Sequence, residues 1–129
     1  MSVPKDFSNV LIIGLGLIGG SIAKKLKQIS YSGVVHGLDN NSKATSMAKE
    51  KGLISSETLN LDNLEDLLVI FCTPVLSIQA ALNSFLSLQP SQKFILTDTL
   101  STKGYIYEML RTEFPELKDK FVSSHPIAG

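Results

Sequence analysis

The sequence predicts a doubly wound α/β domain with a mainly parallel sheet and helices on both faces. Short apolar runs, typical of strands buried on both sides, alternate with segments whose apolar residues recur at helical spacing. This alternation favours parallel strands joined by helical crossovers. The 129 residues fit one domain, and 43% hydrophobic residues suffice for a core. We find no internal repeat or long linker, so we expect a single domain over residues 1–129.

The strands are expected where apolar residues run together. These segments are residues 10–13, 34–38, 67–72 and 94–96, with a short edge strand at 53–54 and a last strand that begins at 121–122.

The helices are expected between these strands. One apolar stripe comprises Ile18, Ile22, Leu26 and Ile29. Ser42 is expected to cap a helix over residues 43–51, which ends at Gly52. Two later stripes comprise Ile78, Leu82, Phe85 and Leu86, and then Ile106, Met109, Leu110 and Glu113.

Composition excludes several classes of function. The 12 Lys and Arg residues are balanced by 12 Asp and Glu, so no basic field favours nucleic acid. Cys72 is the single cysteine, which rules out an intrachain disulfide, and we expect no metal site. The apolar stretches 7–23 and 67–92 are interrupted by Gly, Pro and Asn residues, so neither is expected to span a membrane. The N-terminus has no secretory signal pattern, and we expect a cytoplasmic protein.

A glycine motif follows the first expected strand and opens the first expected helix. Gly14, Gly16 and Gly19 fit G-x-G-x-x-G, in which the glycines allow a tight turn, approach of a pyrophosphate, and close packing of helix on strand. The helix N-terminus would offer N–H groups to the phosphates. The predicted cofactor-binding loop comprises Gly14, Leu15, Gly16, Leu17, Ile18 and Gly19.

Asp39 lies at the end of the second expected strand, 20 residues after Gly19. A carboxylate there would accept hydrogen bonds from ribose hydroxyls and repel a 2′-phosphate, which favours NAD over NADP. Lys43 is a nearby cation that would instead favour NADP. A tight turn without a ligand, with Asp39 as an ordinary turn residue, is the alternative.

Four segments together resemble one enzyme family. They are VLIIGLGLIGGSIAKKLK from Val10, DLLVIFCTPV from Asp66, TDTLSTKG from Thr97 and the terminal SHPIAG from Ser124. In this order they resemble the amino-terminal half of the prephenate/arogenate dehydrogenases of tyrosine biosynthesis, which have a Rossmann-type cofactor domain. The His-Pro-x-Ala-Gly ending is the most specific of the four.

The resemblance implies an NAD-dependent oxidative decarboxylation of prephenate to 4-hydroxyphenylpyruvate, or of arogenate. His125 would hydrogen-bond the substrate hydroxyl and accept proton density as hydride leaves, which suits a neutral imidazole. Ser101 would orient His125 and the nicotinamide. Thr73 and Pro74 would line the cofactor.

The resemblance also implies that the chain is a truncated cofactor domain. In the family, a helical carboxy-terminal domain supplies the arginines for the substrate carboxylates and the homodimer interface. Arg111 is the single arginine here, so we expect a fragment that binds NAD but is inactive alone.

Two other functions fit the glycine motif. One is the cofactor domain of another hydroxy-acid or imine dehydrogenase, against which the His125 motif argues. The other is a nucleotide-sensing regulatory domain of an ion channel or transporter, which this chain length fits but which needs neither Ser101 nor His125.

Overall fold

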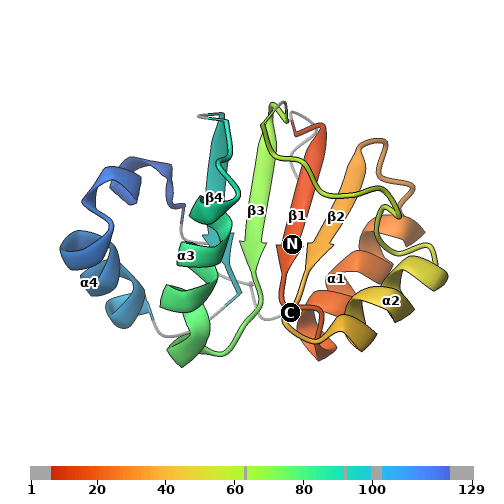
Figure 1. Cartoon of the computed structure of the whole chain (residues 1–129), viewed down its shortest axis with the longest axis horizontal. Helices are drawn as coiled ribbons and strands as arrows, with labels where there is room; N and C mark the ends of the chain where they lie inside the picture. The colour runs from red at the N-terminus through yellow and green to blue at the C-terminus, as the bar shows by residue number, and fades with distance from the viewer. Residues whose placement is uncertain (1–6, 63, 92, 100–102, 123–129) are drawn as a thin grey trace.

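A computed structural model describes residues 7–62, 64–91, 93–99 and 103–122. Four parallel strands form one sheet in the order β2-β1-β3-β4, with helices between successive strands (Figure 1). The predicted doubly wound, parallel architecture is confirmed. The elements are β1 (Asn9–Ile13), α1 (Leu17–Gln28), β2 (Val34–Leu38), α2 (Ser42–Glu50), β3 (Leu67–Phe71), the 3₁₀ turn η1 (Val75–Ser77), α3 (Ile78–Ser87), β4 (Phe94–Asp98), α4 (Lys103–Glu113) and the 3₁₀ turn η2 (Pro115–Lys120).

The central strands β1 and β3 are buried on both faces, which explains their continuous apolar sequences. Alternate residues of β1 enter different clusters. Leu11 and Ile13 pack in a cluster with residues of α3 and α4, whereas Val10 and Ile12 pack with residues of α1. The two clusters form the two layers of the core.

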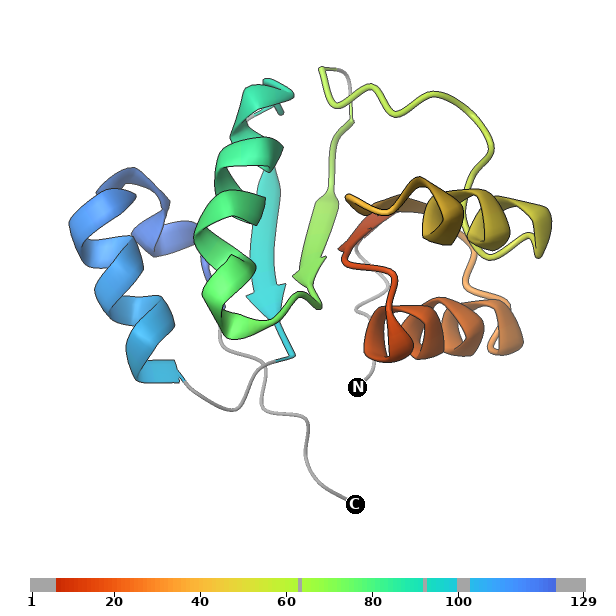
Figure 2. The same cartoon turned by 60° about the horizontal axis from the view of Figure 1, so that its bottom comes forward.

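The helices cover the sheet from both sides. Ala23 and Leu26 of α1 pack on one face, and Leu82 and Phe85 of α3 pack on the other. Figure 2 shows α1 and α2 as separate layers at the β1–β2 end of the domain, with α3 and α4 at the β4 end.

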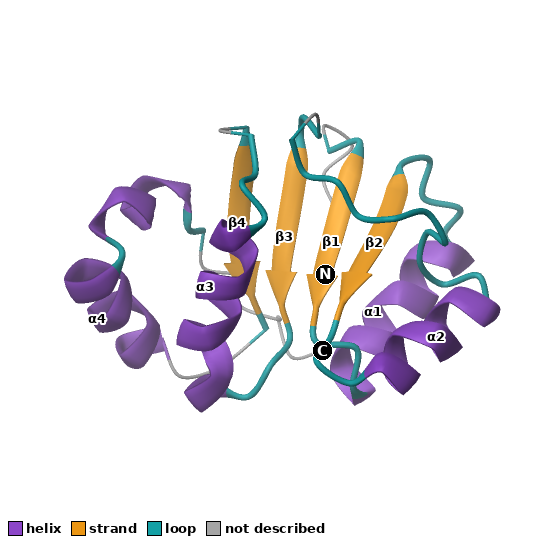
Figure 3. Ribbon diagram, in the orientation of Figure 1, coloured by secondary structure: helices purple, strands orange, loops and turns teal. Residues whose placement is uncertain are grey.

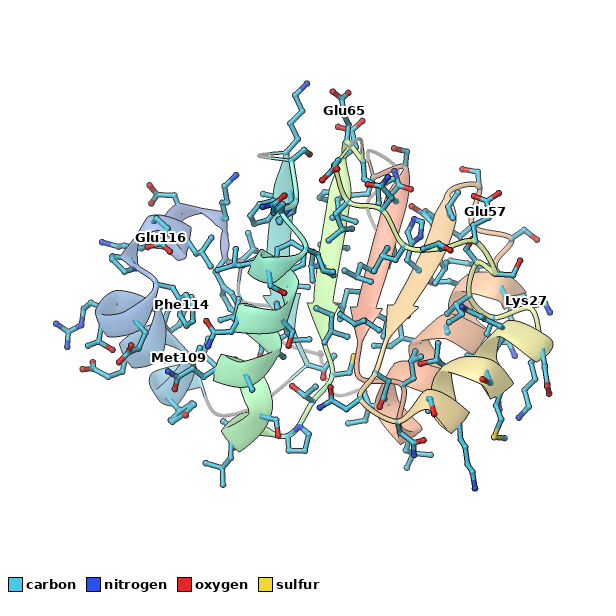
Figure 4. The ribbon with its side chains drawn as sticks, in the orientation of Figure 1. Lys27, Glu57, Glu65, Met109, Phe114 and Glu116 are labelled. Atoms are coloured by element: carbon cyan, nitrogen blue, oxygen red, sulfur yellow. The ribbon has the colours of Figure 1, made fainter. Side chains whose placement is uncertain are left out.

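The apolar stripe predicted for α4 is confirmed at Ile106, Met109 and Leu110, which are buried, but not at Glu113, which is exposed. Figure 4 shows Met109 and Phe114 lying between α4 and α3. Both side chains belong to the same cluster as Phe85 of α3. The α4–η2 segment is therefore held to the domain by apolar packing against the core.

The buried stripe of α1 differs from the prediction. Ile18 and Ile29 are exposed, and the buried positions are Gly19, Ala23 and Leu26. Because Gly19 lies against the glycine loop, this helix approaches the sheet through small residues at its beginning.

The predicted edge strand at residues 53–54 is wrong. The Leu53 N–H donates to the carbonyl of Ala48, which completes the end of α2. A backbone hydrogen bond from this segment to β2 runs from the Ser55 N–H to the Val35 carbonyl, at 2.7 Å. Ile54 is apolar because its side chain is buried, with 4% exposed.

The N-cap of α2 is Asn41 and not the predicted Ser42. The Asn41 side chain accepts from the Lys43 N–H, and Ser42 is the first helical residue. The predicted stop at Gly52 is confirmed by its positive φ of 68°.

The predicted last strand is seen only at its start. Phe121 forms an isolated parallel bridge with Leu96, and the Val122 N–H donates to the Leu96 carbonyl at 2.8 Å.

Among the described residues, no helix is long and apolar enough to cross a membrane.

Candidate functional site

All four strands point the same way, so their carboxyl ends share one edge of the sheet (Figure 3). The loops that follow them carry the glycine motif after β1, Asp39 after β2 and Thr73 after β3. Open parallel sheets bind ligands at this edge. The structure thus brings together the cofactor residues predicted from separate parts of the sequence.

The glycine loop needs its glycines for two different reasons. Gly14 has a φ of 98°, and a Cβ there would lie 3.0 Å from the carbonyl carbon of Cys72. A Cβ on Gly19 would overlap the carbonyl oxygen of Gly14. The predicted roles in the tight turn and in close helix packing are therefore supported by the geometry.

Gly16 differs because nothing lies within 4 Å of the place where its Cβ would be. It is the N-cap of α1 and offers no side chain to the first N–H groups of that helix. Such groups have no intrahelical partner, and the helix dipole makes this end attractive to anions. The open space beside Gly16 is where a phosphate can approach the backbone.

Asp39 is held by two backbone groups. Its Oδ2 accepts from the Leu15 N–H at 2.6 Å, and its Oδ1 accepts from the Asn41 N–H at 2.8 Å. The Gly14 N–H donates to the carbonyl of neighbouring Leu38 at 2.8 Å. These bonds attach the glycine loop to the end of β2 and fix the carboxylate at the site.

A cavity of about 440 Å³ opens between the glycine loop, the end of β2 and α3. This size is within the range of sites for small ligands and cofactors. Its lining residues are Ile13, Gly14, Gly16, Leu38, Asp39, Asn40, Cys72, Thr73, Pro74, Ser77, Ala80, Ala81 and Ser84.

Four of these residues, Ser77, Ala80, Ala81 and Ser84, form a wall from the start of α3 that the sequence analysis missed. They are all small, and their spacing of three to four residues places them on one side of the helix. That pattern of small residues was the available signal. It was overlooked because the larger apolar residues of α3 define its buried stripe.

The Thr73–Pro74 segment lines the cavity. The Thr73 Oγ1 is buried and has no hydrogen-bond partner within the described part of the chain. A ligand in the cavity would supply the partner that this hydroxyl lacks.

Cys72 is part of the same wall, and burial raises the pKa of its thiol to about 11. Cys72 is therefore a neutral thiol at physiological pH, and its place in the cavity wall is one of packing.

The remaining predicted loop residues lie beside the cavity. Leu15 contributes its N–H to Asp39, and Leu17 is 89% exposed at the start of α1. Ile18 is also exposed there.

The two predicted catalytic residues, Ser101 and His125, lie outside the described residues. The strand β4 ends in Asp98, whose side chain is fully buried. Arg111 is exposed on α4 and binds both carboxylate oxygens of Glu108, at 2.6 and 2.7 Å. It does not line the cavity. Within the described ranges, no group of three or more His, Cys, Asp or Glu side chains could hold a metal ion.

A family model described as "Prephenate dehydrogenase, nucleotide-binding domain" matches residues 22–129. The chain is similar to prephenate dehydrogenases of Lactococcus lactis subsp. cremoris (31% identity, 93% of this chain) and Bacillus subtilis (30% identity, 100% of this chain). It spans about a third of each relative, namely 34% of their lengths.

Solved structures agree with these matches. A prephenate dehydrogenase from A. aeolicus, in complex with hydroxyphenyl propionate and NAD⁺, superposes with a TM-score of 0.75 at 29% identity. The match covers 95% of this chain and 43% of that one. The resemblance inferred from the four sequence motifs is confirmed.

Proposed function

This chain belongs to the prephenate dehydrogenase family through its nucleotide-binding domain, and on that premise we propose that it binds NAD at the carboxyl edge of its sheet. One observation carries the proposal. The carboxylate of Asp39 is fixed beside the glycine loop by the Leu15 N–H, next to a cavity into which Gly16 projects no side chain. NAD⁺ in the A. aeolicus relative supports the same cofactor.

The cavity suggests how the dinucleotide would lie. The pyrophosphate meets the N-terminus of α1 at Gly16, and the adenosine ribose hydroxyls donate to Asp39. From that ribose, the adenine reaches the small residues of α3, where Ala80 leaves room for a ring. The proposed cofactor-binding residues are Gly14, Leu15, Gly16, Leu17, Ile18, Gly19, Asp39, Thr73 and Pro74.

Asp39 is also the proposed determinant of cofactor choice. Both of its oxygens already accept a backbone N–H, so the carboxylate cannot turn away from a ribose without breaking those bonds. A 2′-phosphate would bring a second negative charge against it. Lys43, the second residue of α2, donates its backbone N–H to the Asn41 side chain, but its own side chain does not line the cavity.

The proposed reaction is that of the family, the oxidative decarboxylation of prephenate or arogenate. The nicotinamide, when bound, supplies the hydride acceptor. His125 hydrogen-bonds the substrate hydroxyl and accepts proton density from it as the hydride leaves. A neutral imidazole nitrogen is a base suited to this near physiological pH. Ser101 orients His125 by hydrogen bonding.

The longer enzyme is proposed to act as a homodimer through a helical domain that follows residues 1–129, and to reside in the cytoplasm. The oligomeric state of the longer protein is measured by light scattering; a monomer at working concentration would contradict the dimer.

Parallel calorimetric titrations of the chain with NAD and NADP test the cofactor proposal. We expect saturable binding of NAD and at least about tenfold weaker binding of NADP. Tighter binding of NADP would refute the role of Asp39. No binding of either nucleotide would refute the site.

His125→Asn in the longer enzyme tests the catalytic proposal. The expected result is a loss of kcat of about 10²–10⁴-fold with little change in NAD affinity, since the base is removed but the cofactor residues remain. His125→Gln serves as a second replacement of similar shape. A rate within a few-fold of the unmodified enzyme would show that His125 is not the catalytic group.

A further inference from the structure

Gly37 is the fourth of the five residues of β2, and its backbone conformation does not require glycine. It pairs with Ile12 in regular parallel register, and its φ lies outside the left-handed region. Glycine inside a strand weakens it and often marks a close approach of another group. The reason for glycine at this position is therefore space.

Two side chains occupy the space that a side chain at position 37 would take. A Cβ on Gly37 would lie 2.8 Å from Cδ1 and 3.1 Å from Cγ2 of Ile54, and 3.0 Å from Cδ1 of Leu15. Leu15 comes from the glycine loop, and Ile54 comes from the segment after α2. The side chains of Leu15 and Ile54 therefore both pack over Gly37.

Leu15 is attached to β2 through its main chain as well. Its N–H donates to Oδ2 of Asp39, the residue that follows the last residue of β2, at 2.6 Å. The side chain over Gly37 and the N–H at Asp39 therefore hold one residue of the glycine loop at two points.

The Ile54 side of this contact is held firmly. The Lys27 Nζ donates to the Lys51 carbonyl at 2.9 Å, and the Ser55 N–H donates to the Val35 carbonyl at 2.7 Å. Since Ile54 is 4% exposed and Leu15 is half-buried, Leu15 is the side chain that would yield to a new methyl group.

We propose that Gly37 is a positioning residue for the nucleotide site: its missing side chain seats Leu15 on β2 and so holds the glycine loop against Asp39. The inference rests on the proposed binding of NAD. It adds a residue that does not line the cavity and acts only through Leu15.

Calorimetric titration of the chain with NAD measures the effect in Gly37→Ala and Gly37→Val. Overpacking displaces Leu15, so affinity falls about tenfold for Gly37→Ala and further for Gly37→Val. The matched control is Gly33→Ala, at the other end of β2, where a Cβ would collide with Tyr31 and the Ser8 carbonyl. This control loses stability but keeps the NAD affinity at a temperature at which it remains folded.

The Ile54→Ala substitution distinguishes an effect of Gly37 on Leu15 from a general loss of stability. In Gly37→Ala/Ile54→Ala the space left by Ile54 lets the Leu15 side chain shift away from the new methyl group without displacement of the Leu15 main chain. We expect NAD affinity to recover to within a few-fold of the unmodified chain, although the double variant is less stable than either single variant. Further loss of affinity in the double variant would overturn the inference.

A series in the Ile54→Ala background covers the case in which Gly37→Ala does not fold. There Gly37→Ala leaves the affinity unchanged, and Gly37→Val lowers it about tenfold because its larger side chain again reaches Leu15. Equal affinities for the two would overturn the inference. Absence of NAD binding by the unmodified chain would instead refute the proposed function.

Discussion

At the scale of single residues, the site depends on Asp39 having both oxygens engaged by the backbone. The Leu15 and Asn41 N–H groups fix the carboxylate, so no side-chain rotation is needed when a ribose arrives. Preorganised acceptors of this kind retain more of their hydrogen-bond energy on binding. Neutralising the charge while keeping the shape is therefore the informative change.

We expect Asp39→Asn to weaken NAD binding at least about tenfold and to reduce the preference for NAD over NADP, because a charged acceptor becomes neutral and the new NH2 group cannot accept one of the two backbone N–H bonds. Titration with both nucleotides measures the change. Asp62→Asn is the matched control, since Asp62 is exposed and does not line the cavity. An unchanged ratio of the two affinities in Asp39→Asn would contradict the assignment.

Cys72 gives the molecule a pH dependence with a defined sign. Burial raises the pKa of its thiol from 9.0 to about 11, and the nearby Asp98 acts in the same direction. Between these pH values the unfolded chain loses a proton that the folded chain retains. The free energy of unfolding should therefore fall as pH rises from about 9 to about 11.

Urea unfolding over this pH range measures that fall, and Cys72→Ala should show a shallower one. The slope is compared rather than the absolute stability, because the smaller side chain also changes packing. Parallel slopes for the two proteins would refute the buried-thiol explanation.

Residue chemistry explains which parts of the site the sequence revealed. Gly14, Gly16, Gly19 and Asp39 were identified because only glycine and a carboxylate satisfy the turn and the ribose at that spacing. Serine and alanine have no such restricted use, so the α3 wall went unnoticed. Ser101 and His125 remain predictions.

At the scale of elements, α3 combines two functions on adjacent faces. Ile78, Leu82 and Phe85 anchor it in the core, and its small residues form a wall of the cavity. The size of those small side chains sets the width available to a ligand.

Ala80→Leu should fill part of the cavity and weaken NAD binding about tenfold or more, with little effect on the melting temperature, since Leu is a good helix former at an exposed position. Asn83→Leu is the control, as Asn83 is exposed on α3 but does not line the cavity. Titration and thermal melting distinguish the two. Equal affinities for the two variants would remove α3 from the binding site.

Element prediction succeeded wherever a segment was long and periodic and failed where tertiary contacts decided. Residues 53–54 are apolar like a strand, but Ile54 packs over Gly37 and Leu53 packs against the core cluster that includes α1. Asn41 and Ser42 are both able to cap a helix, and the backbone after Asp39 selects Asn41.

At the scale of the whole molecule, the described residues contain a cofactor cavity but no exposed arginine beside it. Arg111, the sole arginine of the sequence, is on α4 and is paired with Glu108. A substrate with two carboxylates is normally bound by arginine side chains that are free to pair with it.

We therefore expect the purified 129-residue chain to bind NAD but to produce little or no NADH when prephenate is added. Absorbance of NADH measures turnover, and NAD titration of the same preparation shows that the chain is folded. Ready prephenate-dependent formation of NADH would contradict this prediction.

The pairing of β1 with β3 has a consequence for how the domain opens. Asn9 pairs with Val34 of β2 and with Leu67 of β3, and Leu67 is further from it along the sequence. The β1–β3 pairing therefore closes a longer loop of chain than the β1–β2 pairing. Partial unfolding along it would separate a β2–β1 half carrying the glycine loop from a β3–β4 half carrying α3. A nucleotide touching both halves then acts as a clamp, and its release loosens the middle of the sheet.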